Sequence, residues 1–372
     1  MIDFELSEEQ QMIRDSVGGF AREEIRAAAR PADESGIIPP ELVAKAWQFG
    51  LVSGAIPEQF GGGGDARSAV TGAIVAEELA FGDFAIALHV LAPRLFAFPI
   101  LEMGTDEQRA KFLKHFCGAD FAAATAAIME PRFDFDLTAM QTIAKRDGAG
   151  FILDGIKCNV PLASESNNIL VYAATDAGKG FAGVDAFIIN RNARDAPGVT
   201  ISEREKNMGL KALATYELTL NDCRVDADAR LGGDKGIDFS RLMSESRVAF
   251  AAMGVGVANA AYEYARDYAK ERKAFGVPIA TKQAIAFILA DMAIEIDASR
   301  LLIWEAAAKL DKGGDALKES YLAKNYVAAS ALKITDNAVQ VLGGHGYIRE
   351  HPVEMWLRNA RGLAAIDGIA TV

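Results

Sequence analysis

The sequence predicts a mainly α-helical fold with a central β domain, and the spacing of the apolar residues carries this prediction. Apolar residues recur at helical spacing over residues 7–113, short β-type runs follow over residues 121–232, and the helical period returns from about residue 239. We therefore expect three domains: an N-terminal α-helical domain at residues 1–120, a small antiparallel β domain at 121–232 and a C-terminal helical bundle domain at 233–372.

Two helix starts in the first domain are marked by polar residues. Ser7 is followed by Glu-Glu-Gln in the arrangement of a capping box, and Thr105 is followed by Asp-Glu-Gln, whose acidic side chains suit the positive end of a helix. The pair Pro39-Pro40 and the glycine run at residues 61–64 interrupt the helical pattern between them. We expect helices separated by turns at these points.

Four runs of aliphatic, β-branched and aromatic residues predict strands in the second domain, at residues 151–153, 169–173, 186–189 and 216–220. Turn sequences such as Asp-Gly and Asn-Asp separate them. In the third domain, long helical patterns cover residues 244–272, 282–312 and 316–342. Alanine and glycine are frequent on these helices, so we expect their axes to approach closely.

Composition and charge exclude several classes of protein. The chain has 372 residues, 51% of them hydrophobic, and a net charge of -12 without a Lys/Arg-rich run, which argues against binding nucleic acid or an anionic membrane. The three cysteines suggest packing rather than a disulfide framework, and the four histidines have no metal-ligand spacing, so we expect no metal. An acidic N-terminus and the absence of a long uncharged run predict no membrane span and a cytoplasmic protein.

Three short motifs near the C-terminal domain have both a structural and a functional interpretation. Arg272 and Phe275 follow a long helix, where a cation can cap the helix or bind phosphate while the aromatic ring packs on a ligand. The glycines of residues 340–347 can end a helix or let a ligand approach the backbone closely. Asp367-Gly368 is a common turn dipeptide, and also supplies a carboxylate.

Taken in order, these segments resemble the acyl-CoA dehydrogenase family of flavoproteins over essentially the whole chain. The matching pieces run from the N-terminal domain through the β domain into the last helices: Gly104-Thr105-Asp106-Glu107-Gln108, Glu130-Pro131 with Asp136, Asp154-Gly155-Ile156-Lys157, Met208-Gly209-Leu210, Asp222-Cys223-Arg224-Val225, Arg247, Arg272 with Phe275-Gly276, Leu289-Ala290-Asp291-Met292, Gln340 with Gly343-Gly344 and Gly346-Tyr347, and Arg358-Asn359-Ala360-Arg361.

The resemblance implies a C-terminal four-helix domain, FAD as cofactor, and α,β-desaturation of an acyl-CoA thioester in lipid degradation. It implies Asp367 as the base that removes the α-proton, and Arg247 and Asp136 as substrate-binding residues. It also implies electron-transfer flavoprotein or a similar acceptor as partner, and a homo- or hetero-oligomer built as a dimer of dimers. The cofactor-binding residues carried over from the family are Met129, Asn159 and Pro161 at the flavin ring, and Arg272, Phe275, Gln340, Gly343 and Gly344 toward the flavin of a neighbouring subunit.

The chain departs from the family pattern where the flavin ring is expected. Met129 stands where the family has threonine, and Asn159-Val160-Pro161 replaces an aromatic-Ile-Thr run, so that proline removes a backbone donor. Asp367 stands where many members have glutamate, and the lost methylene shortens its reach by about 1 Å, which can cost about a hundredfold in rate.

These departures leave three functions open. The first is a working FAD-dependent acyl-CoA dehydrogenase, possibly one subunit of a heteromer, and retained Asp367, Arg247 and Arg272 favour it. The second is a non-catalytic or half-catalytic partner subunit with a degenerate flavin pocket, favoured by Met129 and Asn159 to Pro161. The third is a family member diverted to another flavin reaction, such as an oxidase, hydroxylase or desulfinase.

Overall fold

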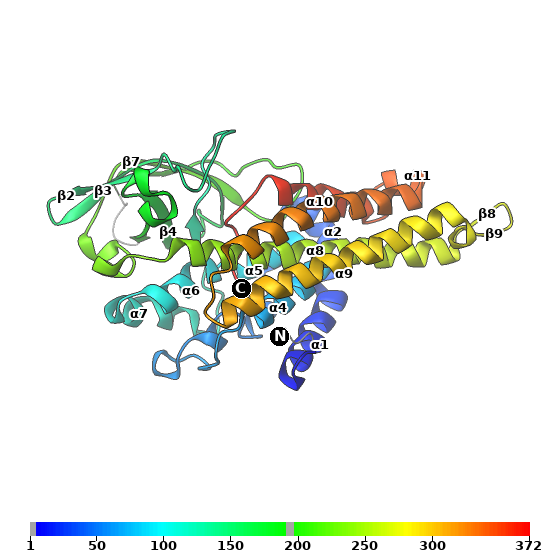
Figure 1. Ribbon diagram of the computed structural model, residues 1–372, viewed down its shortest axis with the longest axis horizontal. Coiled ribbons are helices and arrows are strands. Elements are labelled where there is room, and N and C mark those ends of the chain that lie inside the picture. The colour runs from blue at the N-terminus through cyan, green and yellow to red at the C-terminus, as the bar shows by residue number, and fades with distance from the viewer. Residues whose placement is uncertain (1–4, 191–196) are drawn as a thin grey trace.

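A computed structural model describes residues 5–190 and 197–372 of the chain. Long helices of the C-terminal part run side by side along the molecule, the β-sheet lies at one end of them, and the N-terminal helices pack along their flank (Figure 1). The predicted order of helices, a β domain and a helical bundle is therefore confirmed.

The N-terminal part consists of helices of seven to fourteen residues, α1 to α7. Ser7 and Thr105 begin α1 and α7 with complete capping boxes, as their sequences predict. A π-helical segment, Ala21–Ile25, joins α1 to α2. The helices are α1 (Glu8–Phe20), α2 (Arg26–Ser35), α3 (Pro40–Trp47), α4 (Ala69–Gly82), α5 (Phe84–Leu91), α6 (Arg94–Met103) and α7 (Asp106–Phe112).

The central sheet has seven strands within the described ranges, and the four predicted runs lie in four of them. Strands β2, β3, β7 and β6 are neighbours in antiparallel pairs, and β4 pairs with β1 and β2 along one edge and with β5 along the other. The strands are β1 (Ala124–Ala127), β2 (Ile143–Asp147), β3 (Gly150–Pro161), β4 (Asn168–Ala174), β5 (Val184–Asn190), β6 (Val199–Ile201) and β7 (Thr215–Val225).

The expectation of a purely antiparallel sheet is wrong in one respect, because β4 runs parallel to both β1 and β2. The chain leaves β1, forms the β2–β3 hairpin and returns through β4 in the original direction. Alternation of apolar residues predicts where strands occur, but it carries no information about the direction of a partner that is distant in sequence. The sheet is therefore mixed.

The C-terminal part contains three long helices whose observed ends lie within a few residues of the predicted ones. They are α8 (Phe239–Glu271), α9 (Gln283–Asp311) and α10 (Leu317–Leu342), followed by the short α11 (Gly344–Tyr347) and by α12 (Val353–Arg361). A small hairpin of β8 (Lys273–Ala274) and β9 (Val277–Pro278) connects α8 to α9 at the far end of the molecule from the sheet (Figure 1).

The structure places the cysteines, the possible metal ligands and the most apolar helices. Cys158 and Cys223 are buried, Cys117 is partly buried, and all three are free. Within residues 5–190 and 197–372, no three His, Cys, Asp or Glu side chains are arranged to hold a metal ion. In the same part of the chain no single helix has the length and apolarity to cross a membrane, although α5 and α6 pass that test as a pair bent by 41°.

Glycine brings α8 into close contact with α4, a helix of the N-terminal part. A Cβ atom at Gly256 would overlap the carbonyl oxygen of Glu77 and lie 2.9 Å from the backbone nitrogen of Phe81. Because backbone atoms cannot move aside like the tip of a side chain, this position admits only glycine without a shift of one helix.

We predict that Gly256→Ala destabilises the protein by about 3 kcal/mol, at the upper end of the cost of overpacking a core. Gly19→Ala on α1 is the control, because a Cβ there meets no atom within 4 Å. Alanine favours a helix over glycine, so the control should be neutral or stabilised by up to about 1 kcal/mol. Denaturant unfolding measures both, and equal stability of the two variants would contradict the close packing.

Candidate active site

Asp367 lies in the stretch that follows α12, at the point where the chain turns back onto the end of β1. Its backbone N–H points to Sδ of Met129 at 3.2 Å, and its Oδ1 accepts a hydrogen bond from the backbone N–H of Gly368 at 3.0 Å. Gly368 has φ +73°, and a Cβ there would lie 2.8 Å from Ile128. Glycine is required at this turn both by its conformation and by the space available.

Two cations from two different helices face the Asp367 carboxylate. Arg247 on α8 approaches Oδ2 at 3.7 Å through Nε, and Lys324 on α10 approaches it at 3.9 Å. All three side chains are largely buried, with exposed fractions of 18% for Asp367, 7% for Arg247 and 11% for Lys324. At such distances and burial the attraction is stronger than in water and fixes the position of the carboxylate.

The two cations are themselves incompletely paired. Nε of Arg247 is buried without a hydrogen-bond partner, and its guanidinium lies 5.2 Å from the ring centre of Tyr321. Burial lowers the pKa of Lys324 below its ordinary value although Asp367 raises it, and Arg247 adds to the lowering. The site therefore carries more positive than negative charge, and it suits a ligand with an electron-rich oxygen.

The strand segments expected to face a flavin ring lie side by side. The backbone N–H of Cys158 donates to the carbonyl of Met129 at 2.9 Å, which joins β3 to the end of β1. The register of β3 against β7 shifts after Lys157, and Asn159 takes φ +52° in this bulge. The N–H of Asn159 donates to Glu205 at 3.2 Å, and Pro161 has none to offer.

A buried ion pair fixes the end of β1. The ammonium of Lys157, which is fully buried, donates to the carbonyl of Ile128 at 2.9 Å and lies 3.3 Å from Glu130. Glu130 also accepts hydrogen bonds from the backbone N–H groups of Gln141 and Thr142 and from Arg132. These contacts hold the strand end on which Asp367 rests.

The two members of this pair respond differently to burial. Burial lowers the pKa of Lys157 to about 8, although Glu130 acts in the opposite direction. Burial works to raise the pKa of Glu130, but Lys157 and the two backbone N–H groups outweigh it and hold the pKa below its ordinary value. The charged form of Glu130 is thus better stabilised than that of Lys157. The charge of Lys157 depends on Glu130 as its counter-charge.

Residues predicted to dock a cofactor meet in a second place, at the far end of α8. Arg272, Gly343 and Gly344 line an open pocket of about 430 Å³ together with Tyr268 and His345. Gly343 has φ +58° and ends α10, and it also lines this pocket. The glycine segment therefore both ends a helix and borders a space where a ligand could approach the backbone. The predicted residue Gln340 is exposed on the last turn of α10. The predicted residue Phe275 is 96% exposed in the turn between β8 and β9.

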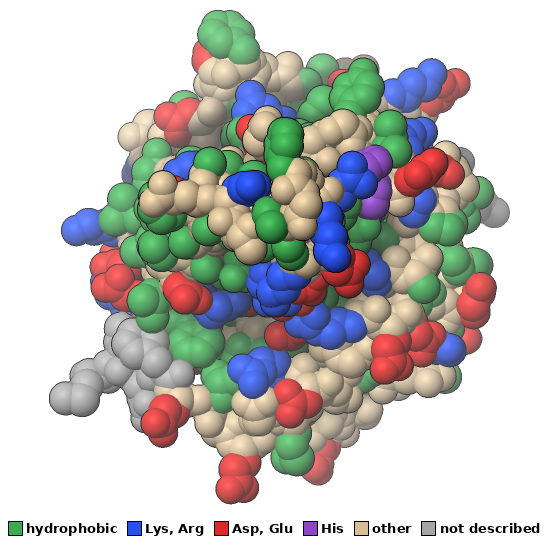
Figure 2. All heavy atoms as spheres, turned by 90° about the vertical axis from the view of Figure 1, so that its right-hand side faces the viewer, with side chains coloured by type: hydrophobic (Ala, Val, Ile, Leu, Met, Phe, Trp, Pro, Cys, Tyr) green, Lys and Arg blue, Asp and Glu red, His purple; other side chains and the backbone are tan. Residues whose placement is uncertain are grey.

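Two tyrosine and histidine pairs stand behind this pocket. The Tyr268 hydroxyl lies 2.6 Å from Nδ1 of His345, and the Tyr264 hydroxyl lies 2.7 Å from Nδ1 of His351. Figure 2 looks onto this end of the molecule, where histidine side chains gather beside Lys and Arg side chains. If each hydroxyl donates to Nδ1, the neutral imidazole carries its proton on Nε2 and presents a further donor.

Asp136, the other predicted substrate residue, lies apart from both groups. It is exposed in the turn between β1 and β2, where Oδ1 accepts hydrogen bonds at 2.8 Å from the N–H and the hydroxyl of Thr138. These hydrogen bonds lower the pKa of Asp136. Asp136 forms its hydrogen bonds with Thr138 and lies away from Asp367, so its role in substrate binding stays a prediction.

Within one chain the two groups of site residues are far apart. The rise of an α-helix puts about 37 Å of helix axis between Arg247 and Arg272, which caps the C-terminus of α8. The group around Asp367 and the group around Arg272 therefore cannot line one compact site in a single subunit.

Sequence reasoning missed Lys324, Tyr268 and His345 as site residues. Lys324 and Tyr268 occupy helical patterns in which a lysine or tyrosine is ordinary, and only the packing of α8 against α10 reveals their neighbours. His345 lies inside the glycine segment, between Gly344 and Gly346, and that position was a usable signal.

The fold combines a helical domain, a mixed sheet and a helical bundle, which together place one carboxylate at a strand end. The N-terminal, middle and C-terminal domains of acyl-CoA dehydrogenase match residues 7–120, 125–223 and 236–372. The chain belongs to the acyl-CoA dehydrogenase family.

Relatives and solved structures extend over nearly the whole chain. The 3-(aryl)acrylate reductase of Clostridium sporogenes is 35% identical over 98% of this chain and 96% of its own length. Subunit CarC of the caffeyl-CoA reductase-Etf complex of Acetobacterium woodii is 36% identical over 98% of this chain and 96% of its own. Butyryl-CoA dehydrogenase of Megasphaera elsdenii superposes with a TM-score of 0.87 at 31% identity, covering 97% and 95% of the two chains. The FAD complex of PigA superposes with a TM-score of 0.88 at 28% identity, covering 97% and 94%.

We predict that Glu130→Gln destabilises the protein by about 3 kcal/mol, because it leaves Lys157 buried without a carboxylate. The double variant Glu130→Gln with Lys157→Met should lose less stability than the two single variants added together. Lys145→Met, on the exposed side of β2, is the control and should change stability by less than about 0.5 kcal/mol. Additive effects in denaturant unfolding would show that the two groups are not coupled.

Proposed function

We propose that this protein is an FAD-dependent acyl-CoA dehydrogenase, which removes hydrogen from the α and β carbons of an acyl-CoA thioester. The observation that carries the proposal is Asp367, a largely buried carboxylate held between Arg247 and Lys324 at the end of β1. A general base for carbon acids needs a fixed position and limited contact with water, and this side chain has both.

In this proposal Asp367 accepts the α-proton, which ends on one of its carboxylate oxygens. Arg247 and Lys324 keep the carboxylate from turning away, and Nε of Arg247, which faces Asp367 without a hydrogen-bond partner, is a donor near bound substrate. Bound FAD supplies the acceptor for the β-hydride. The chain itself contributes position, charge and exclusion of water.

The far end of α8 fits the anionic part of FAD. Arg272 offers a guanidinium for bidentate contact with phosphate, and Gly343 and Gly344 leave backbone open for close approach, since a Cβ on either meets nothing within 4 Å. His345 lies beside them, with Nδ1 2.6 Å from the Tyr268 hydroxyl. These groups match a pyrophosphate better than they match the ring of a flavin.

The distance along α8 supports a site shared between two subunits. Asp367 of one chain would work with Arg272 of another, because about 37 Å of α8 separates Arg247 from Arg272 within one chain. An isologous pair of subunits would form two such sites related by a two-fold axis. Oligomerisation is then part of the catalytic arrangement.

The electron acceptor and the direction of the reaction are part of the proposal. Relatives include a subunit of a reductase-Etf complex, which supports an electron-transfer flavoprotein or a similar acceptor. Two relatives carry the word reductase in their names. The direction proposed for this chain is desaturation.

A second candidate is a partner subunit with an incomplete flavin-ring site. The N–H of Asn159 is already donated to Glu205, and Pro161 has no N–H, so β3 offers fewer donors to a ring. Met129 presents a thioether where a hydroxyl is expected from the family. In that case this chain would supply Arg272 and its neighbours to the flavin of a more typical subunit.

Flavin content separates the two candidates. The chain purified alone should carry one FAD per subunit, measured from its absorption, if it is a complete dehydrogenase. A clearly smaller amount, restored when the protein is expressed with a homologous chain encoded nearby, would establish the partner subunit instead.

We predict that Asp367→Asn lowers the rate of flavin bleaching by acyl-CoA substrates by about 10²–10⁴-fold, the usual contribution of a general base. The FAD content should not change. A panel of acyl-CoA thioesters is mixed with the protein without oxygen, and bleaching is followed by stopped-flow absorption. Asp234→Asn on an exposed turn is the control, and bleaching that survives in Asp367→Asn would remove this residue as the base.

We predict that two inactive variants complement each other when expressed together. In a mixed dimer of Asp367→Asn and Arg272→Glu, one of the two shared sites has both native residues, so random pairing should restore about a quarter of the native activity. Activity is measured with each variant alone and with both. No recovery would mean that Asp367 and Arg272 of the same chain serve the same site.

A further inference from the structure

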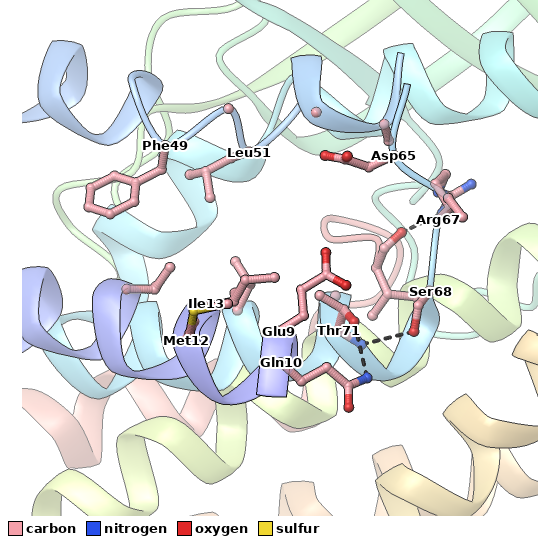
Figure 3. Close-up of a pocket in the computed structure, with 18 of the residues that line it drawn as sticks. Glu9, Gln10, Met12, Ile13, Phe49, Leu51, Asp65, Arg67, Ser68 and Thr71 are labelled. Carbon is pink, nitrogen blue, oxygen red and sulfur yellow. Dashed lines mark hydrogen bonds between the residues drawn. The ribbon is translucent and has the colours of Figure 1, made fainter. Parts of the chain in front are cut away.

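A second cavity, whose lining does not include Asp367, Arg247 or Lys324, lies between α1, the loop at residues 49–55 and the start of α4. Its volume is about 570 Å³. Figure 3 shows Met12 and Ile13 on one wall, Phe49 and Leu51 on the opposite wall, and the carboxylates of Glu9 and Asp65 pointing toward the space. The two walls carry these apolar side chains, serine, threonine and glutamine side chains also line the cavity, and Glu9 and Asp65 are exposed.

Arg94, at the start of α6, is the buried polar group of this cavity. Its side chain is largely buried, with the residue 6% exposed, and Nε donates to the carbonyl of Leu51 at 2.7 Å. Nη1 is buried without a hydrogen-bond partner, and within the described ranges no carboxylate forms an ion pair with this guanidinium. Burial lowers the pKa of Arg94 to about 9, and Arg67 adds to the lowering, so Arg94 is still charged at neutral pH.

The neighbouring Arg67, unlike Arg94, has carboxylate partners. Both guanidiniums lie against the ring of Phe98, at 4.2 Å for Arg67 and 5.1 Å for Arg94. Arg67 forms ion pairs with Glu102 and Glu245. Since a buried charge without a counter-charge is costly, Arg94 is the group that an anion would satisfy.

The distribution of charge around the cavity restricts the shape of such an anion. Positive charge is at the buried end, and the negative charges of Glu9 and Asp65 are at the exposed end. A ligand with a second negative charge at its outer end would be repelled there, whereas an apolar chain would lie against Ile13 and Phe49. The cavity therefore selects one anionic head and an apolar tail.

We propose that this cavity binds a monoanionic amphiphile, a carboxylic acid with an apolar chain, whose carboxylate pairs with Arg94. The chain lies between α1 and the loop at residues 49–55. Val372 also lines the cavity, and the buried stretch from Gly368 to Val372 connects it to Asp367. The cavity does not contain the Asp367 carboxylate. Ligand binding in it therefore does not depend on the proposed dehydrogenase activity.

The test is a calorimetric titration of the full chain with octanoate, compared with octanol and octylamine. Octanoate should bind the native protein. Arg94→Met should lower the affinity for octanoate about 10- to 100-fold, which corresponds to the loss of one hydrogen bond to a charged group. Ile13→Trp, which fills the cavity from α1, should weaken binding without removing a charge. Arg14→Met, on the outward side of α1, removes the same charge outside the cavity and should bind octanoate like the native protein.

Each outcome decides the proposal. Loss of binding in Arg94→Met and Ile13→Trp with retention in Arg14→Met supports it. Equal affinity for octanol and octanoate, equal affinity of Arg94→Met and the native protein, or no binding of octanoate to the native protein overturns it. If Arg94→Met does not fold, Ile13→Trp and the comparison of the three ligands still decide.

Discussion

The length and straight course of α8 are the constraint on which the rest of the structure depends. This helix, Phe239–Glu271, carries Arg247 beside Asp367 and ends next to Arg272, so it fixes both functional regions and the distance between them. It packs against α4 through Gly256 and against α10, from which Lys324 reaches Asp367. Because one helix separates the two regions, the proposed function requires a second subunit to complete the site.

At the sheet end of α8, the position of Asp367 depends on how firmly the end of β1 is held. The Ile128 carbonyl is tied to Lys157, and Gly368 packs directly on the Ile128 side chain. The tight turn brings the backbone of Asp367 to Met129, which compensates in part for the short aspartate side chain. A glutamate could reach a substrate from a looser turn, whereas an aspartate needs this close contact between the turn and the strand.

The long elements of this fold could be predicted from the sequence, while the contacts that make the sites could not. Sustained helical periodicity predicts α8, α9 and α10 because burial of one face repeats over many turns. The parallel pairing of β4 escapes prediction because it depends on the path of the chain between distant strands. The Asp367 carboxylate was predicted from the family motif. Lys324 and Arg94 were not, because no local pattern distinguishes a lysine or arginine that faces a site from one that faces water.

The net charge of the chain is opposite in sign to that of the cations gathered at its candidate sites. The chain as a whole carries -12, yet each of the three candidate sites contains cations: Arg247 with Lys324, Arg272, and Arg94. At physiological ionic strength the field of exposed charges fades over about 8 Å, whereas buried charges are screened far less. The negative surface therefore disfavours polyanions in general, while the largely buried Arg247, Lys324 and Arg94 keep a local attraction for small anions and Arg272 is exposed. Selectivity for such ligands rests on desolvated arginine and lysine side chains rather than on net charge, so replacing a single buried cation should change binding far more than altering several exposed ones.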